Sequence, residues 1–243
     1  MNTVIKSNKL LYTTALAGLV IIFNTCFCYA QGTVTVHKCN DFTVTGTGSS
    51  TEWNKAEWLT LIRQGTASED YSTKVKVLYS GTGIYFLYVC GDKKITSTMK
   101  ADNLNLWEED VVEAFLWTSE DFPVYFEYEI SPMNFELPIM VPNYNGSFLG
   151  WLPWNYDKKR VIHATSVTGG KKESGGAISS WTAEFFIPYG LLAPLPLVPP
   201  VSGTKWRANM YRIDYDNTPV RFMWQPVTRN FHEIKSFGTL IFE

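Results

Sequence analysis

Neither sign of charge dominates this sequence of 243 residues. Its 23 acidic residues nearly balance its 21 lysines and arginines, so the formal net charge at pH 7 is -2. Proteins that bind nucleic acids or anionic membranes usually carry a clear excess of positive charge. The composition therefore gives no electrostatic reason to expect either partner.

The sequence also lacks the common signatures of catalytic and metal sites. It contains no phosphate-binding glycine loop, no HExxH, no GxSxG and no paired CxxC motif. Its histidines, His37, His163 and His232, lie far apart in the sequence, and an isolated histidine is more often a hydrogen-bonded or surface residue than a ligand. These absences argue against nucleotide hydrolysis, zinc-protease and serine-hydrolase chemistry.

Only one long apolar run is present, and it lies at the N-terminus. Lys6 and Lys9 precede an apolar segment over residues 10–23, and small residues follow as far as Ala30. This order is typical of a secretory signal peptide. We expect residues 1–30 to be such a signal and residues 31–243 to form a single exported domain, in the periplasm, on the outer surface or secreted. Nothing after the signal is long and apolar enough to predict a membrane span.

Cysteine is rare, with four residues in the sequence. Of the four cysteines, Cys26 and Cys28 lie in the expected signal, where the residues before each fit a lipoprotein signal poorly. Cys39 and Cys90 remain in the mature chain. An exported protein could pair them in a disulfide, or Cys90 could be a small buried residue, and both interpretations stay open.

Helical periodicity is nearly absent, apart from one turn near residues 54–62. Short alternating segments separated by glycine, proline and asparagine predict strands instead, and together they indicate an all-β fold, an antiparallel β-sandwich of jelly-roll type. Four prolines within residues 131–160 predict a structured loop there and exclude a central strand. The predicted strands cover residues 74–80, 84–90, 111–117, 124–130, 160–168, 180–188, 205–215, 220–226 and 237–243.

The hairpin within residues 104–130 is the most informative stretch. If its apolar residues share one face, an antiparallel pairing of Leu116 with Val124 places Glu113 directly opposite Glu127. Two carboxylates across a ladder repel each other unless a cation or a donor-rich ligand lies between them. The pattern therefore predicts a ligand on this face, with Trp107 in the preceding loop.

Aromatic residues are abundant, with nine Trp, thirteen Tyr and fifteen Phe, so we expect several to face solvent or a ligand. Sugars are bound by aromatic rings that stack on their C–H faces and by carboxylate, amide and guanidinium groups that bind their hydroxyls. The polar candidates on predicted strands are Glu113, Glu127, Glu184, Asn209, Arg212 and Asp214, and the tryptophan candidates on loops or strand ends are Trp107, Trp151, Trp154 and Trp224. Alternatively, Arg212 and Arg207 neutralise the glutamates as structural ion pairs, and the tryptophans cap the two open ends of the sandwich. For Glu184 this structural interpretation is at least as well supported.

The order of these motifs resembles the family 9 carbohydrate-binding modules. The resemblance is carried by Trp107-x-x-Asp110-x-x-Glu113 and by the segments at 125–134, 180–188, 205–214, 222–226 and 232–242, so it extends over nearly all of the mature chain. It implies a non-catalytic β-sandwich that grips the end of an oligosaccharide or polysaccharide between two tryptophans, often with structural calcium and no obligatory cofactor. Typical members are attached to large glycan-degrading enzymes, which are possible partners here.

Carried over by position, the resemblance implies that Trp107 is one of the two rings, that Trp224 is the second, and that Glu113 is the acid that binds the sugar. Asn209, Arg212 and Glu127 complete the expected carbohydrate site. The aromatic segment at residues 148–156 departs from the family's pattern, and we expect it to reshape or cover the pocket.

Three other functions remain open at this stage. A small glycoside hydrolase could use two of the clustered glutamates, since such enzymes need two carboxyl groups on either side of an open cleft. A haem-binding sandwich could use Met133, Met140 or a histidine, although no CxxCH motif is present. An interaction or assembly domain with a degenerate sugar site is the third.

Overall fold

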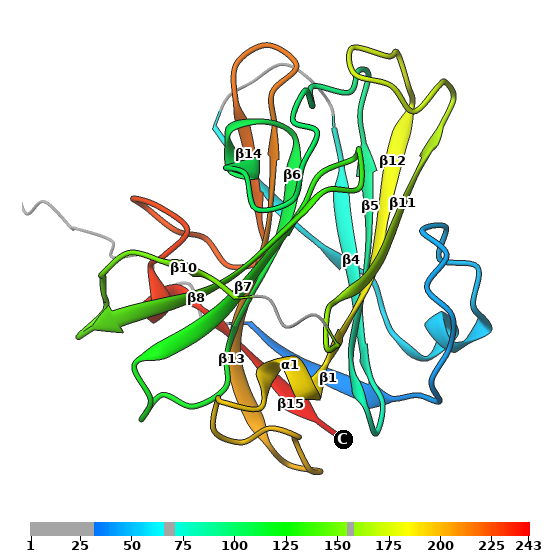
Figure 1. The fold of residues 1–243 in the computed structure, drawn as a ribbon. Coiled ribbons are helices and arrows are strands. Elements are labelled where there is room, and N and C mark those ends of the chain that lie inside the picture. Colours follow the sequence, from blue (N-terminus) through cyan, green and yellow to red (C-terminus); the bar gives the residue numbers. More distant parts are fainter. Residues whose placement is uncertain (1–31, 66–70, 155–157) are drawn as a thin grey trace, which may run out of the picture.

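Two β-sheets face each other in the computed structural model, which describes residues 32–65, 71–154 and 158–243 (Figure 1). The expected signal peptide lies outside these described residues. The first sheet runs in the order β10 (Leu152–Pro153), β8 (Glu136–Tyr144), β7 (Val124–Ile130), β6 (Val111–Trp117), β13 (Lys205–Asp214), β15 (Gly238–Phe242) and β1 (Thr33–Lys38). The second runs β1, β4 (Thr73–Tyr79), β5 (Gly83–Gly91), β12 (Ser180–Pro188) and β11 (Ile162–Thr168).

Short strands and helical turns complete the architecture. Strands β14 (Val220–Met223) and β3 (Ile62–Gln64) extend the first sheet beside β13, β9 (Ser147–Phe148) pairs with β8, and β2 (Leu59–Thr60) pairs with β4. The helical segments are η1 (Thr51–Lys55), η2 (Leu106–Glu108), α1 (Tyr189–Leu192) and η3 (Ile234–Ser236). A helical turn is present as η1, but it lies mostly before the range expected at residues 54–62, and the chain is extended again from Leu59.

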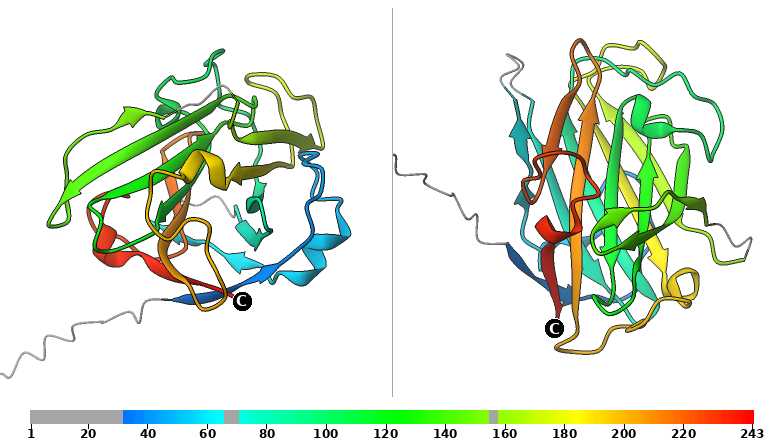
Figure 2. Two further views of the ribbon diagram at one scale, coloured as in Figure 1. Left: turned by 60° about the horizontal axis from the view of Figure 1, so that its bottom comes forward. Right: turned by 90° about the vertical axis from the view of Figure 1, so that its left-hand side faces the viewer.

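The predicted all-β sandwich is confirmed, with one exception to its antiparallel pairing. Strand β1 runs parallel to both neighbours: Thr33–Val36 pair with β15, and His37 and Lys38 pair with β4. It therefore joins the edges of the two sheets, which Figure 2 shows from two further sides.

The core between the sheets contains the apolar face predicted for the hairpin β6–β7. Ala114, Leu116, Phe126 and Tyr128 are all fully buried there, packed in one cluster with Phe185 of β12. Since side chains alternate along a strand, the odd-numbered residues of both strands must face the opposite side of the first sheet. That outer side carries the glutamates.

The predicted register of this hairpin is wrong by two residues. Leu116 pairs with Phe126 rather than Val124, so Glu113 lies opposite Glu129 and Glu127 lies opposite Phe115. The chain turns over residues 119–122, where the amide of Phe122 donates to the carbonyl of Ser119, and the ladder begins beyond this turn. A shift of two residues preserves the faces, so the acids still meet on the outer side.

The structured loop predicted for residues 131–160 is in part a strand, since β8 contains Pro138 and Pro142. The amide of Asn143 donates to the carbonyl of Pro123, the residue before β7. The odd-numbered amides of β8 therefore face β7. The backbone nitrogens of the two prolines, which carry no hydrogen, face the other side of β8, where only the short strands β9 and β10 pair with it. Proline is tolerated at such an edge because no ladder bond is lost.

The two cysteines are not paired. Both are buried free thiols. Cys90 lies in the core between the sheets, whereas Cys39 lies in a separate cluster with Trp53 on the outer side of the second sheet. The sheet separates them, so the interpretation of Cys90 as a small buried residue is the correct one.

Candidate functional site

A cavity of about 350 Å³ lies on the outer side of the first sheet. Its base consists of strands β6 and β7, and three loops form its walls. These loops contain η2, the residues around Phe148 and Trp151, and residues 229–232 before η3. Among the predicted site residues, Trp107, Glu113 and Glu127 line this cavity together. We refer to it as the pocket.

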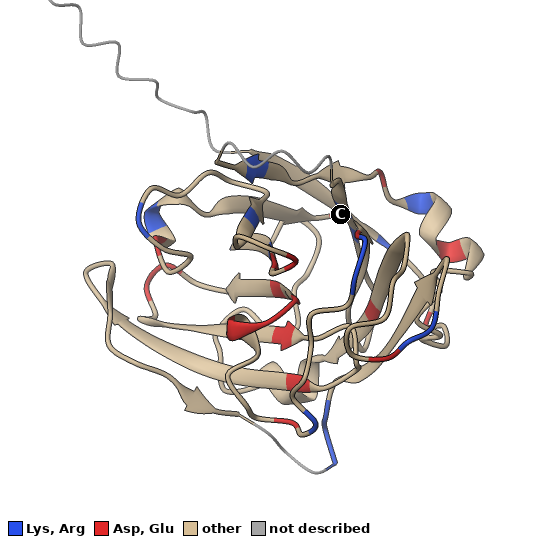
Figure 3. Cartoon of the chain, turned by 90° about the horizontal axis from the view of Figure 1, so that it is seen from above, with Lys and Arg blue, Asp and Glu red and all other residues tan. Residues whose placement is uncertain are grey.

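Three glutamates form the polar base of the pocket. Glu113 of β6 and Glu127 and Glu129 of β7 are 2%, 3% and 0% exposed, respectively. Four of their carboxylate oxygens, one each on Glu113 and Glu127 and both on Glu129, lack a hydrogen-bond partner in the described chain. In Figure 3, acidic positions are visible on neighbouring strands inside the molecule. Buried acceptors without donors indicate a site that a donor-rich ligand would complete.

Burial dominates the protonation of these acids. It raises the pKa of Glu113 to about 8, against a smaller lowering by the charge of Arg221. Burial also raises the pKa of Glu127 and of Glu129 well above the usual range, and the charge of Glu113 adds to both effects. At neutral pH the ligand-free pocket therefore holds carboxyl groups that are largely protonated.

The pH dependence of stability follows from these shifts. Burial also raises the pKa of Asp110 to about 8. A carboxyl whose folded pKa exceeds its unfolded value binds more protons in the folded state, so its stabilisation is lost as pH rises through the folded pKa. Burial lowers the pKa of His163 and of His232, and these shifts change the stability only below about pH 6.5. We expect the Tm to fall by at least about 5 °C between pH 6.5 and 8.5, since two such groups change the stability by a few kcal/mol.

Differential scanning calorimetry tests this dependence. Glu113→Gln removes one of the titrating groups and should flatten the slope. Glu108→Gln, a change at an exposed glutamate outside the pocket, should leave it unchanged. A Tm that is flat or rises across this window would contradict the account of the buried acids.

Successive hydrogen bonds hold the backbone of Trp107 in place. The carboxylate of Asp110 accepts the amides of Thr96 and Tyr215 at 2.6 and 2.8 Å. The hydroxyl of Tyr215 donates to the carbonyl of Trp107 at 2.7 Å. Asp110 of the predicted Trp107-x-x-Asp110-x-x-Glu113 motif thus supports the loop and does not line the pocket.

Trp107 meets Trp151 at a corner. Their ring centroids are 5.7 Å apart, and their planes form an angle of 76°. Trp151 is 37% exposed and Trp107 is half-buried, so both rings present surface to the pocket. This pair is not the facing arrangement expected from the resemblance, which needs roughly 7–8 Å between parallel rings to admit one sugar. Phe148 and Trp151 of the aromatic segment at residues 148–156 thus line the pocket.

His232 forms the opposite wall. Its ring stacks on Phe148, with centroids 4.3 Å apart and an interplanar angle of 24°. Its Nδ1 lies 2.5 Å from the hydroxyl of Tyr125 and 3.7 Å from Glu127. Burial lowers the pKa of His232 to about 4, so the ring is neutral at pH 7.

Three predicted sugar contacts lie elsewhere. Trp224 is 7% exposed and packs in the core between the sheets, so the prediction that it supplies the second ring is wrong. Asn209 is on the outer face but fully buried, where its amide donates to Tyr211 and to the carbonyl of Gln225. Its contacts fix the strand to the following loop, which leaves no free surface for a sugar.

Arg212 faces the other side of the sheet. It is fully buried, and its guanidinium contacts Asp92 at 2.9 Å and also pairs with Asp214. Since Arg212 and Asn209 are three residues apart on one strand, their side chains must point to opposite faces. Arg212 therefore has the structural role of the alternative interpretation, but its partners are aspartates and not the glutamates expected there.

The same cluster is where the structure offers oxygen ligands for calcium. Asp92, Asp214 and Asp216 bring carboxylate oxygens within 4.8 Å of one another. The guanidinium of Arg212 already binds two of these acids, and Lys94 lies 3.8 Å from the third. Calcium prefers six to eight oxygen ligands without a cation among them. The residues as arranged do not fit calcium, and the expectation of structural calcium stays a proposal.

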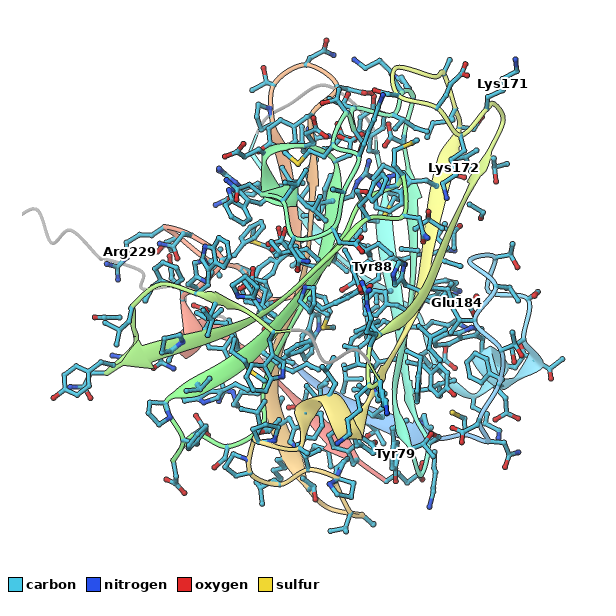
Figure 4. All side chains as sticks on the ribbon, in the orientation of Figure 1. Tyr79, Tyr88, Lys171, Lys172, Glu184 and Arg229 are labelled. Carbon is cyan, nitrogen blue, oxygen red and sulfur yellow. The ribbon has the colours of Figure 1, made fainter. Side chains whose placement is uncertain are left out.

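Glu184 holds the segment before η1 against the second sheet. Its carboxylate accepts the amides of Thr45 and Gly46 at 2.8 and 2.7 Å and the indole N–H of Trp53 at 2.8 Å. Figure 4 places Glu184 beside this segment, across the molecule from Arg229 at the rim of the pocket. The structural interpretation of Glu184 is therefore the correct one.

Removing the Glu184 carboxylate should destabilise the fold. We expect Glu184→Ala to lower the free energy of unfolding by about 3 kcal/mol, because it leaves several donors without an acceptor. Urea denaturation measures this loss. Glu57→Ala, at an exposed glutamate of the same region, should change it by less than about 0.5 kcal/mol. Equal effects of the two substitutions would contradict this role of Glu184.

Sequence reasoning missed several residues of the pocket as site residues, chiefly Glu129, Phe148, Arg221 and His232. A signal for Glu129 existed, because it follows Glu127 by two residues and shares its face. No comparable signal existed for Arg221 and His232, since they reach the pocket only through tertiary packing.

Residues 44–139, which include η2, β6, β7 and the three glutamates, match the family model described as carbohydrate family 9 binding domain-like. The resemblance to family 9 carbohydrate-binding modules is confirmed. No curated protein is a significant match to the sequence of this chain.

Solved structures share the fold of this family 9-like chain. A candidate carbohydrate-binding protein from Bacteroides uniformis ATCC 8492 is 19% identical, with a TM-score of 0.73 over 88% of this chain and 100% of the other. A family 9 carbohydrate-binding module from Caldicellulosiruptor kristjanssonii is 17% identical in complexes with cellotriose and with glucose, with TM-scores of 0.62 and 0.63. These alignments cover 87% of this chain and 94% and 96% of the module. At these identities the likeness establishes the fold.

Within the described residues of this family 9-like chain, no helix has the length and apolar character needed to cross a membrane.

Proposed function

We propose that this protein is an exported, non-catalytic module that binds the end of a glycan in the pocket. The observation that carries the proposal is the meeting of Trp107 with Glu113 in one accessible cavity, together with acceptors that lack donors. Sugar hydroxyls supply such donors, and the indoles of Trp107 and Trp151 offer apolar surface to a pyranose. The family match supports the class of ligand.

The corner geometry suggests how a sugar would sit. A ring that stacks on one indole would meet the edge of the other, because the planes of Trp107 and Trp151 are nearly perpendicular. Its hydroxyls would then point to Glu113 and Glu127 at the base. Behind this base, the hydroxyl of Tyr88 on β5 donates to the backbone carbonyl of Glu113 at 2.8 Å and supports β6 from the second sheet (Figure 4).

Binding to a glycan panel tests the proposal. Isothermal titration calorimetry with cello- and xylo-oligosaccharides should detect at least one ligand. Substitution of Trp107 in the pocket should weaken the binding of that ligand. If no glycan binds, the proposal fails and an interaction or assembly module with a degenerate sugar site becomes the better account. Export, glycan-degrading partner enzymes and structural calcium are parts of the proposal that need their own tests.

One observation favours a second function. Glu113 has a pKa of about 8 and shares a cavity with two further acids, a combination that a glycoside hydrolase uses for its general acid. We expect no turnover of aryl glycosides, because the matched family is one of binding domains. Hydrolysis that disappears in Glu113→Gln would instead establish an enzyme.

A further inference from the structure

The base of the pocket holds more carboxyl groups than the pocket walls hold positive partners. Arg221 on β14 lies near enough to lower the pKa of Glu113 by its charge, so these two residues compensate each other. Glu127 and Glu129 have no such partner in the described part of the chain. Within the described chain, the basic side chain that lies within 4 Å of Glu127 is His232, which is neutral at pH 7. Arg229 lies on the rim, and its side chain points outward (Figure 4).

Two tyrosine hydroxyls lie close enough to the glutamates to interact with them electrostatically. Burial raises the pKa of Tyr125 and of Tyr211, so neither is charged at neutral pH. Both oxygens of Glu129 and one of Glu127 lack hydrogen-bond partners. Within the described chain, these buried oxygens therefore have capacity for further donors and no cation beside them.

We propose, on the basis of the proposed glycan-binding function, that the preferred ligand is an amino sugar whose protonated amine sits between Glu127 and Glu129. An ammonium group supplies three donors and one positive charge, whereas each hydroxyl of a neutral sugar supplies one donor and no charge. The indoles of Trp107 and Trp151 line the same pocket and also favour a cation in it, because an aromatic face attracts positive charge. An N-acetylated sugar has the same ring but lacks the charge.

Three disaccharides that share one linkage test the proposal: the β-1,4 dimers of glucosamine, of glucose and of N-acetylglucosamine. Calorimetry of the full chain at pH 6 should give an affinity for the glucosamine dimer at least about tenfold above that for the other two. Glu129→Gln should reduce this ratio to near one. Glu108→Gln, which removes an exposed charge next to Trp107, should leave the ratio unchanged.

Proton release provides a second measurement that needs no variant. Burial and mutual repulsion keep the acids protonated without ligand, so an ammonium must displace a proton to pair with a carboxylate. Titrations in two buffers of different ionisation enthalpy should show about one proton released per glucosamine dimer bound and fewer for the glucose dimer.

The outcomes separate this inference from the proposed function. Equal or tighter binding of the glucose dimer, or no proton release with the glucosamine dimer, would overturn the amino-sugar assignment and leave glycan binding intact. Failure of all glycans to bind would overturn both. If Glu129→Gln does not fold, Glu127→Gln and the proton count decide the matter.

Discussion

Trp107→Ala should weaken glycan binding by about 10–100-fold, because the substitution removes one wall of the pocket and the apolar surface on which a sugar stacks. Trp151→Ala should have a similar effect, since its ring forms the other side of the corner. Isothermal titration calorimetry with the tightest-binding oligosaccharide measures both losses.

A matched tryptophan provides the control. Trp58 is 37% exposed, as is Trp151, but it packs against Lys74 and Lys76 on the second sheet, away from the pocket. Trp58→Ala should leave the affinity within about twofold of the wild type. If all three substitutions weaken binding equally, or none does, the pocket is not where the glycan binds. The Tm of each variant shows whether its fold is intact.

Arg212→Met should cost about 3–5 kcal/mol of stability, the second large effect that we expect. The side chain is fully buried and neutralises Asp92 and Asp214, so its loss leaves buried acids without a countercharge. Urea denaturation at pH 7 measures the loss. Lys55→Met breaks the partly exposed pair with Glu52 and should cost less than about 1 kcal/mol.

Calcium distinguishes two accounts of the same cluster. If the guanidinium of Arg212 takes the place of a calcium ion between the aspartates, neither calcium nor a chelator should shift the Tm of the wild-type protein. Calcium should raise the Tm of Arg212→Met, because Asp92, Asp214 and Asp216 are then free to bind it. A wild-type Tm that falls on chelation would contradict this and would support the structural calcium implied by the family resemblance.

Alternation along strands was the most reliable guide from sequence to structure. It placed the apolar residues of β6 and β7 in the core and their glutamates together on the other face. It did not fix the pairing, because a two-residue shift in register preserves every face. The opposition of Glu113 to Glu129 therefore required the turn geometry at residues 119–122.

The same alternation would have improved the predicted site. Asn209 and Arg212 cannot share a face of one strand, so both could not contact one ligand. Trp224 was placed by its position in a family-like motif, but alternation puts it on the core face with Val220 and Phe222, where Gly238 leaves room for its ring. The prolines of β8 led to a wrong prediction of a loop, because the free-energy cost of a proline in a strand depends on which neighbour its nitrogen faces. The sequence does not show that neighbour.

The loops that complete the pocket were the least predictable part. Trp151 and His232 are far from Trp107 in sequence, and only tertiary packing brings them together. The sequence did identify the aromatic segment at residues 148–156 as a departure from the family's pattern, and two of its rings, Phe148 and Trp151, line the pocket.

The most direct test of glycan binding in the pocket is a crystal structure of the full chain with the oligosaccharide that binds it most tightly in calorimetry. The account predicts a terminal sugar in the pocket, in contact with the indole of Trp107 and hydrogen-bonded to Glu113. A sugar bound elsewhere on the molecule, with the pocket closed by its own side chains, would contradict it.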